Sequence, residues 1–221
     1  RGRQCTLEGY VCNGKMHIYG VVDSLREGQH SSSFSRYQYP STIPGHVQRK
    51  MIMITERFMK HIGFDNGPFN IEYFWESDKN ELWLLEINTR ISKSHGPLFQ
   101  DVDGLSNHKV MLDLGLGQQP DFPHRRGSYN IAAKFMWRIY EDARVERVPA
   151  KTELMDIQHR FPSAEIQLQI EKGMTLSLMK DQDSYSYEIA VIFLGGNSEE
   201  ELLQKYYEIQ QAMHIELVPV S

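Results

Sequence analysis

Two short runs of alternating residues, at 67–76 and 81–89, constrain this chain more than any other feature of the sequence. The turn-forming residues Ser77-Asp78-Lys79-Asn80 lie between the runs, and this pattern predicts an antiparallel hairpin. One alternating set is apolar and consists of Phe69, Ile71, Tyr73, Trp75, Trp83, Leu85 and Ile87. The other set carries the carboxylates and amides and consists of Asn70, Glu72, Phe74, Leu84, Glu86 and Asn88. We therefore expect one face of the hairpin to be buried and the other to be polar.

The register of this hairpin follows from the same pattern. The apolar residues of the two strands lie on one face only if the residue numbers of each cross-strand pair add up to an even number. This condition places Glu72 opposite Glu86, and it predicts the further pairs Trp75/Trp83 and Tyr73/Leu85. It also requires a loop of odd length, most simply Asp78-Lys79-Asn80 with Asn80 in the left-handed conformation.

Two opposed glutamates point to a cation. Their Cβ atoms would lie about 5 Å apart, and like charges at that separation are destabilising unless something neutralises them. Glu72, Glu86 and the amide oxygen of Asn88 offer only hard oxygen ligands, which favours Mg²⁺ or Mn²⁺ over zinc. Because magnesium usually bridges to substrate phosphates, such a site implies a nucleotide or a phosphorylated intermediate. Arg90 is two residues after Asn88 and so is expected on the same face, where its guanidinium could hold a phosphate or a carboxylate. The alternative is that both glutamates simply form a solvated face.

A first hairpin is predicted around Asn13-Gly14, because both central residues of a type I′ turn need positive φ. Pairing outward from this turn places Glu8 opposite Tyr19 and gives the pairs Leu7/Gly20 and Cys5/Val22. The cysteines, Cys5 and Cys12, then lie on one hairpin, where we expect no disulfide. Free cysteines favour a reducing compartment, and we expect a cytoplasmic protein.

The rest of the chain predicts a mixed α+β fold. An amphipathic helix is expected at 45–62, stopped at Gly63, after a polar loop at 24–44. The later predicted segments are a helix at 104–116, a linker at 117–127, strands at 128–138, 164–170 and 185–194, a helix at 198–214 and a strand at 215–220. The linker suggests two domains, 1–127 and 128–221.

The charge balance limits the partners. There are 24 Lys and Arg residues against 29 Asp and Glu residues, a net charge of −5, which argues against a nucleic-acid surface. No window approaches the roughly 18 consecutive apolar residues that a bilayer span needs, so we expect no membrane partner. The expected partners are small molecules.

Two strings in the second hairpin resemble the ATP-grasp superfamily. They are Gly67-Pro68-Phe69-Asn70-Ile71-Glu72-Tyr73 and Leu85-Glu86-Ile87-Asn88-Thr89-Arg90-Ile91, which resemble its "G...E" and "E-(I/M/V)-N-x-R" strands. The pattern is most similar to biotin carboxylase and to the carboxylate-amine ligases, including the L-amino acid ligases. The resemblance implies that 1–127 is the C-terminal ATP-grasp subdomain, an antiparallel sheet with packed helices. It also implies that 128–221 is a small carboxylase-like α+β domain, with Ser184 to Gly196 as one of its characteristic portions.

The resemblance also implies roles for particular residues. Glu72 and Glu86 would coordinate the Mg²⁺ (or Mn²⁺) ions that bridge the ATP phosphates, and Asn88 would complete one coordination shell. Glu8, on a strand pair similar to the one after the adenine-binding hinge, would bind the nucleotide cofactor. Arg90 would be the catalytic residue that binds the acyl phosphate or its carboxylate precursor. The implied activity is a ligase that activates a carboxylate with Mg-ATP for attack by an amine or a thiol.

The sequence also departs from this pattern. Biotin carboxylase has Gln-Val-Glu-His after its Asn-x-Arg, whereas this chain has Ser92-Lys93-Ser94-His95, which removes the acidic base and argues against carboxylation of biotin. The subdomain that carries the glycine-rich lid would precede Arg1. We therefore expect a C-terminal fragment that is inactive alone. The expected protein partner is either a second copy of the chain, in a homodimer, or the missing N-terminal half, on the same polypeptide or on another chain.

Two other readings compete with a ligase. The first is a non-catalytic nucleotide-binding or dimerisation module derived from an ATP-grasp fold. The second is glycoside hydrolysis by the pair Glu72 and Glu86, which would leave Asn88 and Arg90 without a role.

Overall fold

The computed structural model describes residues 2–27, 32–180 and 186–220, which fall into two compact units. Unit 1 comprises Arg1–Leu25 and Tyr37–Ala132, and unit 2 comprises Arg26–Arg36 and Ala133–Ser221. The predicted mixed α+β class, with antiparallel strands and packed helices, is confirmed. The sequence-based domain limits, 1–127 and 128–221, stay a prediction. Arg1, Ser184 and the predicted strand start at residue 185 lie outside the described residues.

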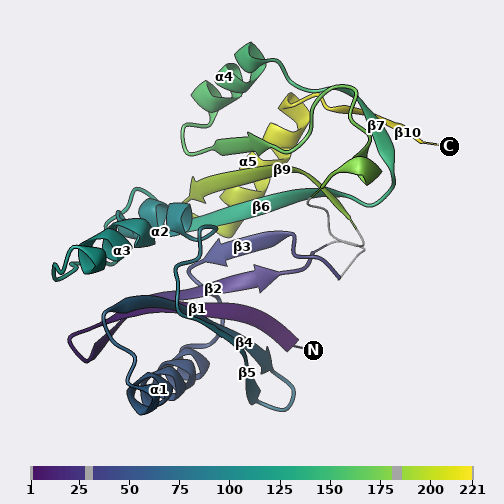
Figure 1. Cartoon of the computed structure of the whole chain (residues 1–221). Coiled ribbons are helices and arrows are strands. Elements are labelled where there is room, and N and C mark those ends of the chain that lie inside the picture. The colour runs from purple at the N-terminus through teal and green to yellow at the C-terminus, as the bar shows by residue number, and fades with distance from the viewer. Residues whose placement is uncertain (1, 28–31, 181–185, 221) are drawn as a thin grey trace. The chain divides into compact units, whose positions relative to one another are not determined.

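Unit 1 is built on an antiparallel sheet. Its strands are β1 (Gly2–Cys12), β2 (Lys15–Leu25), β3 (Arg36–Tyr39), β4 (Gly67–Glu76) and β5 (Glu81–Asn88). They lie in the order β5-β4-β1-β2-β3, so the two hairpins predicted from the sequence are joined through β1 and β4. The short strand β3 was not predicted and lies inside the expected polar loop. Helix α1 (Gly45–Ile62) packs against one face of this sheet (Figure 1).

Helix α1 matches its prediction closely. Its buried residues, Val47, Met51, Thr55 and Met59, recur every four positions, the spacing of one helix face. Gly63 ends the helix with φ 66°, the left-handed conformation that a residue without Cβ adopts most readily. The buried core beneath the helix is formed by Cys5, Leu7, Val11, Val21, Ile43, Val47, Met51, Met59, Phe69, Ile71, Tyr73 and Trp75.

The first hairpin has the predicted turn but a different register farther from it. Asn13 and Gly14 have φ values of 52° and 72°, as a type I′ turn requires. Between Glu8 and Gly9 the register shifts by one residue, because Tyr19 is an extra residue on β2. Glu8 therefore pairs with Gly20, and the predicted pairing of Glu8 with Tyr19 is wrong. The predicted pairs Leu7/Gly20 and Cys5/Val22 are wrong for the same reason, since Val21 and Asp23 take those places.

The second hairpin contains a bulge as well. Its loop has four residues, Ser77–Asn80, so the predicted odd-length loop is wrong, although Asn80 is left-handed as expected with φ 53°. The register shifts between Glu72 and Tyr73, where Leu85 is the extra residue. Beyond this bulge the predicted pair Glu72/Glu86 is confirmed. Between the bulge and the loop, Trp83 pairs with Phe74 and Leu84 with Tyr73. The predicted pairs Trp75/Trp83 and Tyr73/Leu85 are therefore wrong.

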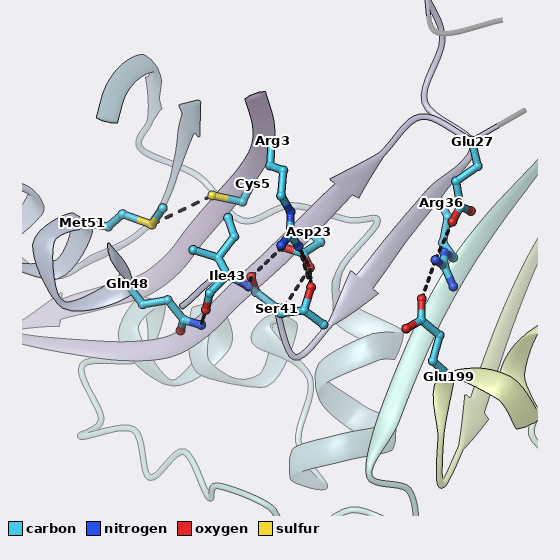
Figure 2. Close-up of polar contacts among 11 residues, drawn as sticks. Arg3, Cys5, Asp23, Glu27, Arg36, Ser41, Ile43, Gln48, Met51 and Glu199 are labelled. Carbon is cyan, nitrogen blue, oxygen red and sulfur yellow. Dashed lines mark hydrogen bonds and ion pairs between the residues drawn. The ribbon is translucent and has the colours of Figure 1, made fainter. Parts of the chain in front are cut away.

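A buried carboxylate ties β2 to the segment that leads into α1. Asp23 is 1% exposed and accepts hydrogen bonds from Arg3 Nη2 at 2.8 Å and from Ser41 Oγ at 2.5 Å (Figure 2). The backbone nitrogen of Thr42 donates to the same carboxylate at 2.8 Å. These contacts satisfy a charge that would otherwise be costly to bury, and they fix the start of the helix relative to the sheet.

Two short helices replace the single helix predicted at 104–116. They are α2 (Gly96–Asp103) and α3 (Asn107–Gly115). Gly104, with φ 85°, ends the first, and the Ser106 hydroxyl caps the second by accepting from the His108 backbone nitrogen. The predicted linker at 117–127 has neither helix nor strand, and the Tyr10 hydroxyl donates to its Pro120 carbonyl oxygen at 3.3 Å.

Unit 2 contains the remaining strands and helices. Its elements are β6 (Ile131–Ile139), β7 (Ala143–Arg147), α4 (Lys151–Arg160), β8 (Glu165–Leu168), η1 (Leu176–Leu178), β9 (Tyr187–Gly196), α5 (Glu199–Ala212) and β10 (Glu216–Pro219). Strands β6, β9 and β8 are neighbours in that order, and β7 pairs with β10. The sequence did not predict β7 and α4. Within this unit the buried Arg36 side chain donates to Glu27 and to Glu199 (Figure 2).

Cys5 and Cys12 are both buried and free. Across the described parts of the chain, no helix has both the length and the apolar character needed to cross a bilayer.

Candidate functional site

Two rows of polar residues cross the sheet of unit 1. In one row Thr6 pairs with Glu72, which pairs in turn with Glu86. In the next row Glu8 pairs with Asn70, and Asn70 pairs with Asn88. Since paired residues point to the same face of a sheet, all these side chains share one face.

The neighbouring positions on the same strands point the other way. Leu7, Ile71 and Ile87 belong to the core that packs beneath α1. The face with the two glutamates is therefore the one that α1 does not cover. Glu72 is half-buried and Glu86 is exposed, so both carboxylates are accessible from this side.

Among the residues that the structure describes, no cationic side chain forms an ion pair with this glutamate pair. The ion pairs found among residues 2–27, 32–180 and 186–220 include none to Glu72 or Glu86, and Glu72 instead accepts a hydrogen bond from the neutral amide of Gln4 at 2.8 Å. The same hairpin provides a comparison, because Glu76 and Glu81 also face each other. There Lys79 lies 3.1 Å from the Glu76 carboxylate. An opposed pair without such a partner is electrostatically unfavourable until a cation binds.

Asn88 and Arg90 are linked to the sheet through Asn70. The Asn88 Nδ2 atom donates to Asn70 Oδ1 at 3.2 Å, which leaves the Asn88 amide oxygen as the atom that can face a cation beside the glutamates. Asn70 in turn donates from Nδ2 to the Arg90 carbonyl oxygen at 2.9 Å. Arg90 lies just beyond the end of β5, and its side chain is exposed.

Glu8 lies in the same row but is fully buried. One carboxylate oxygen contacts His95 Nδ1, and the other accepts from Asn107 Nδ2 at 3.3 Å. Burial, and next the charge of Glu8, raise the pKa of Tyr19 well above its ordinary value. The role of Glu8 as a nucleotide-binding residue stays a prediction.

The donor set fits a hard divalent cation that also binds a substrate. Within the described part of the chain, no group of three His, Cys, Asp or Glu side chains could hold a metal ion. Glu72 and Glu86 with the Asn88 amide oxygen supply an incomplete shell of oxygens. Magnesium in proteins is commonly bound by one or two carboxylates together with water and substrate phosphates, so these residues suit Mg²⁺.

The structure adds residues that the sequence did not single out as site residues. Asn70 is two residues before Glu72 on β4 and therefore lies on the same face, so strand alternation could have identified it. Asn107 comes from α3 and carries no local signal. The bulge at Leu85 turns Trp83 onto the glutamate face, where it pairs with Phe74.

The chain is similar to known ATP-binding proteins in sequence. Residues 38–121 match the family described as "Carbamoyl-phosphate synthase L chain, ATP binding domain". Urea amidolyase of Saccharomyces cerevisiae is 25% identical over 137 residues, which are 61% of this chain and 7% of that protein. The resemblance to ATP-grasp proteins seen in the sequence is confirmed.

Solved structures show the same fold. The L-amino acid ligase from Bacillus licheniformis has a TM-score of 0.73 at 15% identity, over 97% of this chain and 52% of that one. The biotin carboxylase domain of Hydrogenobacter thermophilus 2-oxoglutarate carboxylase, determined with MgADP and bicarbonate, has a TM-score of 0.67 at 15% identity. That match covers 98% of this chain and 46% of that one. The chain thus spans about half the length of these two proteins and a much smaller part of urea amidolyase.

Proposed function

We propose, from the premise that these residues form part of an ATP-grasp fold, that the chain is the cation-binding part of an ATP-dependent carboxylate-amine ligase. The observation that carries this proposal is the glutamate pair Glu72/Glu86, which lies on the face of the sheet opposite α1, without a cationic partner among the described residues. The family match and the fold support nucleotide chemistry at this face.

In this proposal Glu72, Glu86 and Asn88 hold Mg²⁺, which would neutralise charge on the phosphates of ATP. Arg90 binds the substrate carboxylate, or the acyl phosphate made from it, through its exposed guanidinium. Asn70 fixes the backbone at Arg90 through the hydrogen bond to its carbonyl oxygen. Donors aimed at developing negative charge lower the barrier to phosphoryl transfer.

The proposed reaction has two steps. A substrate carboxylate oxygen takes the terminal phosphoryl group of ATP, and the bond between that phosphorus and ADP breaks. The nitrogen of an amine then attacks the carbonyl carbon, inorganic phosphate leaves, and the nitrogen loses a proton to give an amide. L-amino acid ligase, which shares the fold, is by name a protein of this reaction class.

We also propose that these 221 residues bind a nucleotide weakly and turn over slowly or not at all. The sequence contains no G-x-x-x-x-G-K-[ST] phosphate loop, and the chain matches only about half of its structural relatives. Activity would then require a further segment or a second chain. A homodimer is one such arrangement, and the Hydrogenobacter biotin carboxylase domain is described as a dimer.

Paramagnetic Mn²⁺ tests the cation site even when binding is weak. In an NMR titration with Mn²⁺ and ADP, we expect the backbone amide signals around Glu72, Glu86 and Asn88 to broaden first, and ADP to increase the effect. Glu86→Gln should remove this local broadening. The matched control is Glu81→Gln, which changes an exposed glutamate on the same strand and should leave the broadening intact.

The titration also separates a ligase from a non-catalytic nucleotide-binding module. Broadening that survives Glu86→Gln would exclude the proposed cation site. Broadening that depends on Glu86, combined with an Arg90→Ala variant that binds acetyl phosphate as well as the wild type does, would favour a non-catalytic nucleotide-binding module.

A further inference from the structure

We propose that Glu8 is a positioning residue that, with Asn107, fixes the backbone segment carrying Arg90, rather than a residue that touches the nucleotide. The proposal deepens the proposed function, because it rests on Arg90 as the residue that binds the carboxylate or acyl phosphate. The segment concerned is residues 89–95, which follow β5 and precede α2 and contain bends and turns but neither helix nor strand.

The first anchor is the contact between Glu8 and His95. Glu8 is 0% exposed and His95 is 4% exposed, and the Glu8 carboxylate contacts His95 Nδ1. The ring of Tyr37 packs edge-on against the imidazole at 5.2 Å between centroids. A carboxylate buried to this degree needs a charged or hydrogen-bonding partner, and His95 provides one. The end of the segment is thereby tied to the centre of β1.

The second anchor is Asn107, the first residue of α3. Its Nδ2 atom donates to the second Glu8 oxygen at 3.3 Å and to the Ser92 carbonyl oxygen at 3.0 Å. One buried amide group thus joins the carboxylate to the middle of the segment. The third anchor is the hydrogen bond from Asn70 to the Arg90 carbonyl oxygen.

These anchors fix the backbone at Arg90 but not its side chain. The hydrogen bond found for the Arg90 guanidinium is to the carbonyl oxygen of the adjacent Ile91 at 3.5 Å, which cannot set the direction of an exposed side chain. The position of Arg90 therefore depends on contacts made by β1, β4 and α3. Strands and helices hold side chains more precisely than loops do, so these contacts can place a substrate-binding group on an irregular segment.

The same contacts explain why Glu8 is unsuited to binding a nucleotide directly. Both of its oxygens have partners, and its side chain has no exposed surface. To reach a ligand, Glu8 would have to leave His95 and Asn107 at once, and two buried polar groups would lose their hydrogen bonds.

Hydrogen–deuterium exchange and phosphate binding test the proposal on the whole chain. We expect Glu8→Gln and His95→Ala each to speed amide exchange in residues 89–95 by about tenfold, because each substitution leaves a buried polar group without its hydrogen bond. Exchange in α1 should not change. The dissociation constant for inorganic phosphate, measured by NMR at the Arg90 side chain, should rise by a similar factor.

Conservative variants distinguish positioning from simple loss of structure. His95→Gln retains an amide donor for Glu8 and should restore most of the protection and of the phosphate affinity that His95→Ala loses. Lys93→Ala changes an exposed side chain of the same segment and serves as the control that should leave both measurements unchanged. Should Glu8→Gln fail to fold, Asn107→Ala removes the second anchor and makes the same prediction.

Two outcomes would overturn the proposal. The first is unchanged exchange in residues 89–95 for both Glu8→Gln and Asn107→Ala. The second is a Glu8→Gln protein that loses the Mn²⁺-ADP broadening while its segment stays protected, since this would make Glu8 a ligand of the nucleotide. Wild-type protein that binds no phosphate would contradict the function proposed for Arg90, and the exchange measurement would still decide whether Glu8 holds the segment.

Discussion

Glu72 and Glu86 face each other across β4 and β5 on the side of the sheet that α1 leaves open. In the same hairpin Glu76 and Glu81 also face each other, but there Lys79 lies beside the pair. This difference between two glutamate pairs on one hairpin is the physical basis for expecting a divalent cation at the first pair.

The first prediction concerns stability. Without divalent cations, Glu72→Gln should increase the free energy of unfolding by up to about 1 kcal/mol, because it removes repulsion between directly opposed like charges. Addition of Mg²⁺ should raise the melting temperature of the wild type but not of the variant. Urea denaturation and thermal melts in EDTA and in Mg²⁺ measure both effects. If Glu72→Gln destabilises the protein in EDTA, repulsion between the two carboxylates is not significant.

The second prediction concerns the buried Asp23. Asp23→Asn should lower the free energy of unfolding by about 1–3 kcal/mol, because it weakens the bond to Arg3 and places an amide donor among the donors of Ser41 and Thr42. Chemical denaturation measures the loss. Asp156→Asn, at an exposed position of α4, should change stability by less than about 0.5 kcal/mol. Equal effects of the two substitutions would show that the Asp23 contacts contribute nothing.

The third prediction concerns pH and His17. Its ring stacks on Tyr10 at 4.7 Å, and burial lowers its pKa below the ordinary value of 6.5, with Lys15 adding to the effect. The unfolded chain therefore takes up a proton at this residue at a higher pH than the folded protein does. Stability should fall as the pH drops through 6.5 and toward the lower folded-state pKa.

Denaturation curves between pH 8 and 5 measure this effect. His17→Gln should reduce the slope of stability against pH in that range, whereas a replacement of the exposed His61 should not. An unchanged slope in His17→Gln would mean that other groups cause the acid sensitivity.

The fourth prediction concerns the cysteines. Burial, and next the charge of Asp23, raise the pKa of the Cys5 thiol well above its ordinary value, and Cys12 is buried as well. Since the thiolate is the reactive form, neither residue should react with iodoacetamide in the native protein, whereas both should react in denaturant. Mass spectrometry after timed labelling measures this, and rapid native labelling of Cys5 would contradict its burial in the core.

The sequence predicted the paired glutamates, the helix α1, the Asn13-Gly14 turn and the left-handed Asn80, because strand alternation, helical spacing and left-handed turn residues are local signals. The prediction of strand register failed at Tyr19 and at Leu85, where one extra residue forms a bulge. A bulge and a loop longer by one residue shift the alternation of apolar and polar residues in the same way, so the sequence does not distinguish them. The contact of Glu8 with His95 and Asn107 could not be predicted, because it joins three elements that are distant in the sequence.

A crystal structure with Mn²⁺ and ADP would test the central claim most directly. Anomalous scattering should place Mn²⁺ within bonding distance of the carboxylates of both Glu72 and Glu86, with phosphate oxygens completing its coordination. ADP bound on this face with Mn²⁺ held away from both glutamates would contradict the account.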